Sequence, residues 1–116
     1  MARATCHCEN VVVRIDALAE RVTRCNCSIC RRYAPLWGYH TETTVTVQVG
    51  DAGLRTYCWG DEMVNFHHCG RCGCVTHYTR GPKGEGDRLA VNYRLFDNAT
   101  VDSLPVREFD GENMGA

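Results

Sequence analysis

The sequence contains no apolar run long enough to cross a bilayer as a helix, and the residues after Met1 do not form the apolar segment of a signal peptide. We therefore expect a cytoplasmic protein with no membrane partner. A strong charge of one sign is also missing, because thirteen basic and fourteen acidic residues leave a net charge of -1. This balance argues against nucleic acid as a partner. Lysine is nearly absent, with only Lys83, so any bound anion would be held by planar arginine contacts.

A long helical pattern is missing too, and short alternating or β-branched runs predict a mainly β fold. The runs expected to form strands are 11–15, 21–25, 36–40, 44–49, 54–59, 63–68, 74–78 and 89–95. Only Ser28–Tyr33 suits a helical turn, with Ser28 as its cap. The 116 residues fit a single domain, 1–116, with a core at about 3–96 and a polar, largely irregular tail at 97–116.

Cysteine, by contrast, is abundant, and seven of the nine cysteines fall into three tight clusters. The clusters are Cys6 and Cys8; Cys25, Cys27 and Cys30; and Cys69 and Cys72. A disulfide framework is disfavoured because the count is odd, no export signal is visible, and cysteines two residues apart do not bridge comfortably. Short-spaced thiolates are the ligands that zinc prefers in proteins, so the clusters predict metal binding.

Two of the clusters together predict a closed structural site. Cys69-Gly-Arg-Cys72-Gly has the glycines that a tight metal-binding turn requires, and it needs a second pair of ligands. Cys6 and Cys8 are the other compact pair outside the triplet. Four thiolates leave no open position on zinc, so this metal would tie the N-terminus to a later hairpin.

The triplet Cys25, Cys27 and Cys30 predicts a zinc with one position left over, as in catalytic sites. That position could be taken by water or by a substrate sulfur. Alternatively, Cys58, Cys74 or a histidine could close the site and make it structural. Cys58 and Cys74 lie within expected strands and also suit small buried hydrophobes.

Arg24, Arg31 and Arg32 flank this triplet and have two interpretations. Their guanidinium groups could lower thiolate pKa values and attract an anionic substrate. The plainer interpretation is a solvated, charged face of the protein.

Taken together, the clusters resemble the glutathione-dependent formaldehyde-activating enzymes, the family that also includes centromere protein V. The resemblance lies in Thr5-Cys-His-Cys8, Cys25-Asn-Cys-Ser-Ile-Cys-Arg31 and His68-Cys-Gly-Arg-Cys-Gly73, and more weakly in 90–94 and 104–111. Glu9 stands where the family often has glycine. The resemblance implies a small, zinc-stapled β-tent of the Mss4-like type with little helix. It also implies two zincs per chain, one structural at Cys6, Cys8, Cys69 and Cys72, and one functional at Cys25, Cys27 and Cys30.

The family's named activity implies that glutathione and an aldehyde, formaldehyde, are joined to S-(hydroxymethyl)glutathione. A zinc-dependent carbon–sulfur lyase is therefore the first hypothesis, with His68 or His77 as candidate proton donors. The second hypothesis is a non-enzymatic interaction module in which both zincs are structural. A fourth protein ligand at the triplet would favour the module. A homodimer is a further possibility, because the alternating strand at 44–49 could pair at a sheet edge.

Overall fold

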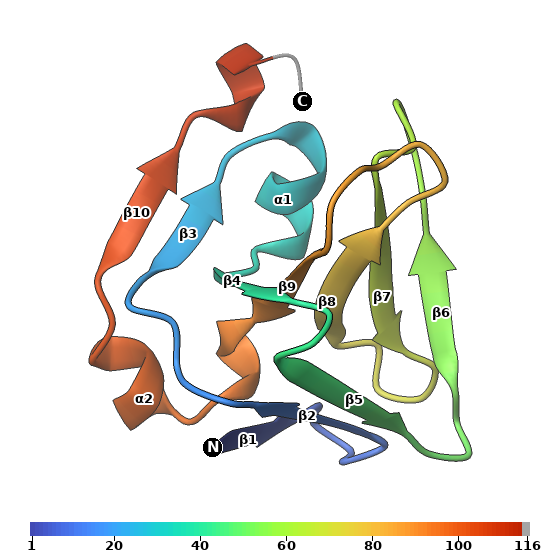
Figure 1. The fold of residues 1–116 in the computed structure, drawn as a ribbon, viewed down its shortest axis with the longest axis vertical. Helices are drawn as coiled ribbons and strands as arrows, with labels where there is room; N and C mark the ends of the chain where they lie inside the picture. The colour runs from blue at the N-terminus through green and yellow to red at the C-terminus, as the bar shows by residue number, and fades with distance from the viewer. Residues whose placement is uncertain (115–116) are drawn as a thin grey trace.

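The computed structural model describes residues 1–114, which fold into two β-sheets with short helical segments (Figure 1). The smaller sheet has the order β1-β2-β5, and the larger has the order β10-β3-β4-β9-β8-β7-β6. The strands are Ala2–Thr5 (β1), Val11–Ile15 (β2), Val22–Cys25 (β3), Trp37–Thr41 (β4), Val45–Val49 (β5), Leu54–Tyr57 (β6), Val64–Cys69 (β7), Val75–Arg80 (β8), Arg88–Asn92 (β9) and Val106–Phe109 (β10). The fold is mainly β, as the sequence predicts.

All strand pairings in the described chain are antiparallel except the pairing of β10 with β3. In that parallel pair Val106 lies opposite Val22, and Phe109 lies opposite Cys25. The last strand therefore ends beside the first cysteine of the triplet. Figure 1 shows β10 and β3 running side by side in the same direction.

The helical segments are α1 (Ser28–Tyr33), α2 (Asn98–Asp102) and the 3-10 turns η1 (Tyr93–Leu95) and η2 (Gly111–Met114). The helix at 28–33 is confirmed, but its expected cap is wrong. Cys27, not Ser28, caps α1, and its side chain accepts a hydrogen bond from the Cys30 amide. No helix of residues 1–114 combines the length and the apolar character that a membrane crossing requires.

The first hydrophobic core lies against the smaller sheet. Alternation along β2 buries Val11, Val13 and Ile15 to at most 1% exposure, while Val12 and Arg14 stay partly exposed. A second buried cluster lies beneath α1 and consists of Cys27, Cys30, Trp37, Phe66 and Ala90. Two cysteines of the triplet therefore belong to a packed core, which limits their movement.

The predicted strands between residues 11 and 78 correspond to β2 through β8 and are confirmed to within two residues. The strand predicted at 89–95 is too long. It ends at Asn92, whose side chain accepts a hydrogen bond from the Arg94 amide and starts the η1 turn. β1, which was not among the predicted strands, has only four residues and pairs with β2, with Ala2 opposite Ile15. β5 lies at a sheet edge as expected, and pairing with a second copy there stays a prediction.

The largest correction concerns the tail at 97–116, which was expected to be largely irregular. Between 97 and 114 it contains α2, β10 and η2. Strand β10 is mostly exposed and has no buried alternating face, so its local pattern resembles that of a loop. It is a strand because its backbone pairs with β3, more than eighty residues earlier. Residues 115 and 116 lie outside the described part.

Candidate metal centres

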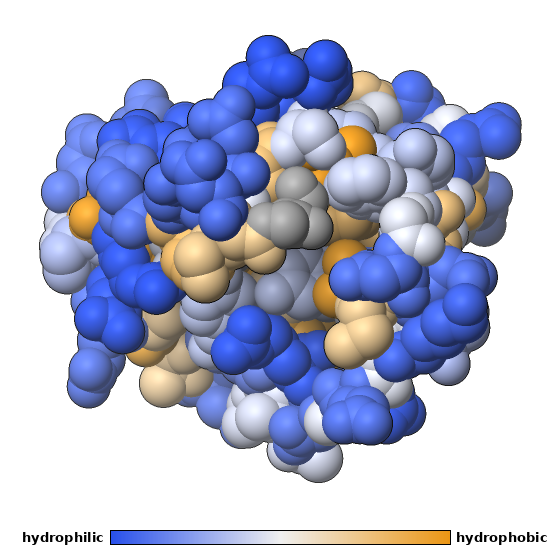
Figure 2. All heavy atoms as spheres, turned by 90° about the horizontal axis from the view of Figure 1, so that it is seen from above, coloured by the Kyte–Doolittle hydropathy of each residue, from blue (hydrophilic) through white to orange (hydrophobic). Residues whose placement is uncertain are grey.

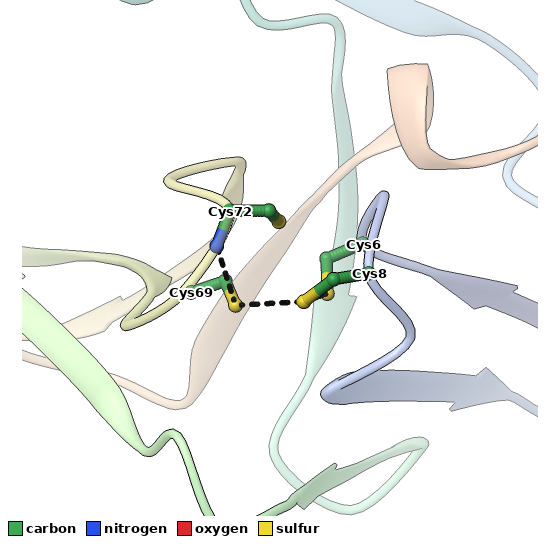
Figure 3. Close-up of side chains that lie close together, drawn as sticks. All are labelled: Cys6, Cys8, Cys69 and Cys72. Atoms are coloured by element: carbon green, nitrogen blue, oxygen red, sulfur yellow. Dashed lines mark hydrogen bonds between the residues drawn. The ribbon is translucent and has the colours of Figure 1, made fainter.

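The first centre brings Cys6, Cys8, Cys69 and Cys72 together (Figure 3). Cys6 and Cys8 lie in the turn between β1 and β2, Cys69 ends β7, and Cys72 lies in the turn to β8. The four Sγ atoms lie within 4.8 Å of one another, with 3.8 Å between Cys6 and Cys8 and 3.6 Å between Cys8 and Cys69. Tetrahedral zinc with Zn–S bonds of about 2.3 Å needs sulfurs roughly 3.8 Å apart. The donor set therefore fits a metal ion such as zinc.

Hydrogen-bond donors around this centre favour ionised sulfur. The Val11 amide donates to Cys6 Sγ at 3.3 Å, although burial outweighs this bond and raises the pKa of Cys6 to about 11. Asn10 Nδ2 donates to Cys69 Sγ at 3.4 Å. Burial opposes ionisation of Cys69, but the amides of Cys72 and Arg71 and the Asn10 side chain outweigh it. They lower the pKa of this thiol to about 5. Such donors orient and stabilise the thiolates that a metal needs.

The turn at Cys8 contains Glu9, the residue at which the sequence departs from the resemblance. Glu9 has φ of 65°, in the left-handed region. This conformation costs a non-glycine residue roughly 1–2 kcal/mol. The Cys6 carbonyl accepts a hydrogen bond from the Glu9 amide at 3.1 Å, so the turn keeps its geometry. The departure therefore leaves the placement of Cys6 and Cys8 intact.

The second centre is the triplet, whose three Sγ atoms also lie within 4.8 Å of one another. Cys25 ends β3, Cys27 caps α1 and Cys30 lies within α1. Cys27 and Cys30 are buried, whereas Cys25 is half-buried. Within residues 1–114, no fourth Cys, His, Asp or Glu joins this group. The expected closure by Cys58, Cys74 or a histidine is therefore not found, and one side of the centre is open to a ligand from outside the chain.

The triplet sulfurs differ in their surroundings. Burial opposes ionisation of Cys27, yet hydrogen bonds from the Cys30 amide and the neighbouring thiols outweigh it and lower its pKa. Burial raises the pKa of Cys30, although Trp37 Nε1 donates to its Sγ at 3.4 Å. Without a metal, Cys27 is thus the first of these two thiols to ionise. A bound cation would favour the thiolate form of all three.

The segment that follows β10 packs against the triplet, a contact that local sequence patterns do not reveal. A Cβ atom on Gly111 would lie 2.5 Å from Cys25 Sγ and 3.0 Å from Cys27 Cβ, so only glycine fits. Asn26 joins the two segments, because its side-chain oxygen accepts from the Glu112 amide at 2.9 Å and its Nδ2 donates to Asp110 at 3.0 Å.

This packing makes Gly111 a testable support of the triplet. We expect Gly111→Ala to displace Cys25 and to weaken metal binding at the triplet by about 10–100-fold, as substitutions beside metal ligands do. Competition with a chromophoric chelator measures the affinity. Glu112→Ala is the matched control, because only the Glu112 backbone contacts Asn26. Equal affinity in wild type and Gly111→Ala would contradict this role.

A cavity of about 420 Å³ opens beside the triplet, and we call it the cationic cavity. Its lining consists of Cys25, Cys30, Trp37, Tyr39, Val64, Phe66, Tyr78, Arg88, Arg107 and Phe109. Aromatic contacts stiffen its walls, with Trp37 and Tyr78 edge to face at 4.9 Å between centroids. Figure 2 shows the molecule from above the view of Figure 1, with scattered apolar residues among larger hydrophilic areas.

The two arginines of the cationic cavity stack on aromatic rings. The Arg88 guanidinium lies 4.4 Å from the Tyr39 ring centroid, and that of Arg107 lies 5.2 Å from the Phe109 centroid. Neither arginine belongs to the ion pairs found among residues 1–114, which are Arg24–Glu108 and Lys83–Glu62. The charges of Arg88 and Arg107 are therefore available to an anionic ligand. Arginine binds carboxylates in a bidentate manner.

The arginines that flank the triplet in sequence lie elsewhere. Arg24 pairs with Glu108, and Arg32 Nη1 donates to the Ser28 carbonyl at 2.8 Å. All three, including Arg31, are exposed, and none lines the cationic cavity. The plainer interpretation, a solvated charged face, is the correct one. Arg88 and Arg107 were missed because they reach the triplet only through strand pairing.

The two candidate proton donors do not line the cationic cavity either. Phe66 and Tyr78 are cross-strand partners that line it, whereas His67 and His77 form the next pair and point to the opposite face. The His77 ring stacks on His67 at 4.6 Å and lies 2.7 Å, through Nδ1, from Thr76 Oγ1. His77 therefore does not line the cavity beside the triplet, and its role in proton transfer stays a prediction. His68 is half-buried and also lies outside the lining.

The buried position of His77 predicts a pH dependence of stability. Burial lowers the pKa of His77 to about 3, whereas an unfolded histidine titrates near 6.5. Above pH 6.5 the ring is neutral in both states and contributes nothing. As pH falls toward 3, only the unfolded state takes up this proton, so stability falls by up to about 1.4 kcal/mol per pH unit.

The test compares urea unfolding of wild type and His77→Phe between pH 6 and 4.5. We expect the variant to lose stability less steeply as pH falls. The slope of its unfolding free energy against pH should differ from that of wild type by up to the contribution of about one bound proton. Thiolate protonation and metal loss are common to both proteins and cancel in the difference. Equal slopes of unfolding free energy against pH in the two proteins would show that His77 is not a neutral buried group.

Comparison with known proteins agrees with this arrangement. The family model described as glutathione-dependent formaldehyde-activating enzyme matches residues 1–109, which include both cysteine centres and β10. Among solved structures, the crystal structure of a Rhodobacter sphaeroides protein superposes with a TM-score of 0.74 at 24% identity, covering 91% of this chain and 100% of the other. That similarity shows that the fold is shared.

Proposed function

Because the chain belongs to the glutathione-dependent formaldehyde-activating enzyme family, we propose that it joins a thiol to a carbonyl compound and catalyses the reverse cleavage. This is the chemistry of a carbon–sulfur lyase, with glutathione and formaldehyde as the substrates that the family suggests. One observation carries the proposal: three cysteines hold their sulfurs within 4.8 Å, without a fourth described ligand, beside a cavity with two arginines.

The two centres have different roles in this proposal. Cys6, Cys8, Cys69 and Cys72 hold a structural zinc, because four thiolates complete its coordination. Cys25, Cys27 and Cys30 would hold a second zinc, which would supply Lewis-acid stabilisation of the thiolate form of a substrate thiol near neutral pH. The Trp37 indole donates to Cys30 Sγ, the Cys30 amide to Cys27 Sγ and the Cys27 amide to Cys25 Sγ. These hydrogen bonds keep the three sulfurs in place.

The cationic cavity binds the thiol substrate. Glutathione carries two carboxylates, and Arg88 and Arg107 provide two guanidinium groups in the wall of the cavity. The rings of Tyr39 and Phe109 position these groups by stacking, which reduces the entropy lost on binding. Trp37, Phe66 and Tyr78 exclude water from the space in front of Cys25 and Cys30.

The reaction is an addition, and it needs no oxidant or reductant. The thiol sulfur forms a bond to the carbonyl carbon, and the electron pair of the C=O π bond moves to oxygen. The oxygen takes up one proton, and the thiol has lost one. In the reverse direction the carbon–sulfur bond breaks and the same proton returns to sulfur.

The arginine roles lead to a direct prediction. We expect Arg88→Gln and Arg107→Gln each to weaken glutathione binding about tenfold or more, since a hydrogen bond to a charged group contributes roughly 1.5–3 kcal/mol. Binding of 2-mercaptoethanol, which has no carboxylate, should not change. Arg31→Gln is the control, because Arg31 is exposed and outside the cavity. Calorimetry measures both ligands, and a glutathione affinity that neither variant alters would contradict the role.

The proposed function itself is tested by titrating glutathione into protein whose two zincs have been confirmed by metal analysis. Saturable binding, together with faster exchange between formaldehyde and its glutathione adduct in NMR exchange spectra, would support it. Absence of both in fully loaded protein would overturn it. The interaction module would then be the remaining hypothesis, although no fourth ligand for the triplet lies within residues 1–114.

A further inference from the structure

A second cavity, of about 290 Å³, opens on the other side of the triplet. We call it the apolar cavity; its lining includes Cys27, Ile29, Trp59, Met63, Val64 and Phe66. It shares Val64 and Phe66 with the cationic cavity, so these two side chains form a common wall. Cys25 and Cys30 face the cationic cavity, and Cys27 faces the apolar one. A ligand at the three sulfurs would therefore lie next to both cavities.

The two cavities differ in chemical character. No arginine or lysine lines the apolar cavity, and its one acidic residue, Asp61, accepts a hydrogen bond from the Met63 amide at 3.2 Å. Trp59 is 37% exposed and Met63 41% exposed, although both are large apolar side chains. Apolar side chains that line a cavity beside a reactive centre are typical of a ligand site.

Formaldehyde does not account for this cavity, because its single carbon carries no hydrocarbon group. An apolar cavity of about 150 Å³ is large enough to hold benzene. The apolar cavity, at about 290 Å³, can therefore take a group of about six carbons. Filling it would remove apolar surface of both protein and ligand from water.

We propose that the apolar cavity binds the hydrocarbon group of the carbonyl substrate, so that the chain acts on glutathione adducts of apolar aldehydes of several carbons. This inference rests on the proposed function. The thiol sulfur adds to the aldehyde carbon, the C=O π electrons move to oxygen, and oxygen takes up one proton. The glutathione part lies in the cationic cavity, and the hydrocarbon part lies beside Ile29, Trp59 and Met63.

The two tryptophans of the chain report on the two cavities separately. Trp37 lines the cationic cavity and donates to Cys30, whereas Trp59 lines the apolar cavity. Each gives one indole N–H signal in a proton–nitrogen correlation spectrum, and Trp59→Phe assigns them. Zinc-loaded full-length protein is titrated with glutathione, 1-hexanol, S-methylglutathione and S-hexylglutathione. The last two are stable analogues of a small and a large adduct.

We expect 1-hexanol to shift the Trp59 signal saturably, glutathione to shift the Trp37 signal, and S-hexylglutathione to shift both. S-hexylglutathione should bind about tenfold or more tightly than S-methylglutathione, since each fully buried methylene strengthens binding by roughly fourfold. Trp59→Ala should reduce this ratio toward one. Tyr57→Ala is the matched control, because Tyr57 is an exposed aromatic residue outside the lining.

Two results would overturn the inference. One is a Trp59 signal that neither 1-hexanol nor S-hexylglutathione moves; the other is equal affinity for the hexyl and methyl compounds in wild type. A Trp37 signal unmoved by glutathione, with the Trp59 response to 1-hexanol intact, would count against the proposed thiol while supporting the apolar site. The two proposals therefore fail in distinguishable ways.

Discussion

Stripping the metal from Cys6, Cys8, Cys69 and Cys72 is expected to unfold the chain. These cysteines join the turn between β1 and β2, in the smaller sheet, to the β7–β8 hairpin of the larger sheet. Zinc bound to such a set contributes on the order of ten kcal/mol in isolated peptides, which is comparable to the whole stability of a domain. Without it, four crowded thiols remain between the sheets, and Cys69 tends to ionise.

Circular dichroism melting before and after removal of zinc by a strong chelator measures this effect. Cys69→Ser should reproduce the loss, either as a large drop in melting temperature or as insoluble protein. Cys58→Ser is the control, because Cys58 is half-buried and is not among the four grouped sulfurs. A melting temperature that complete zinc removal leaves unchanged would contradict the structural role.

Cys27→Ser is expected to abolish glutathione binding and turnover while the fold survives. The substitution removes the thiolate that caps α1 and accepts from the Cys30 amide, leaving only two sulfurs for the second metal. Metal affinity at the triplet should fall by more than about 100-fold, because even substitutions beside metal ligands cost roughly 10–100-fold. Zinc content should drop from two to one per chain.

Metal analysis, calorimetry with glutathione and NMR exchange rates test this prediction on the same preparation. Cys58→Ser is the control, since Cys58 is half-buried and lies outside both centres. Retained melting temperature would show that the other centre still stabilises the fold. Turnover that persists after the triplet has lost its zinc would refute the proposed mechanism.

The sequence alone determined the two cysteine groups and most of the strands. Cysteines two or three residues apart lie in one turn, so spacing suffices to group Cys25, Cys27 and Cys30, and the remaining two pairs combine by elimination. Alternation with a period of two is likewise local, and it correctly predicts β2 and the strands that follow it.

The surroundings of the triplet were decided only by the tertiary structure. Arg88, Arg107 and Gly111 lie far from Cys25 in sequence, and the pairing of β4 with β9 and of β3 with β10 brings them to it. His77 is excluded from the cavity because a strand presents successive side chains to opposite faces, and register decides which face it takes. Local spacing can therefore group cysteines within one turn, whereas the cavities beside them depend on long-range pairing that no short pattern encodes.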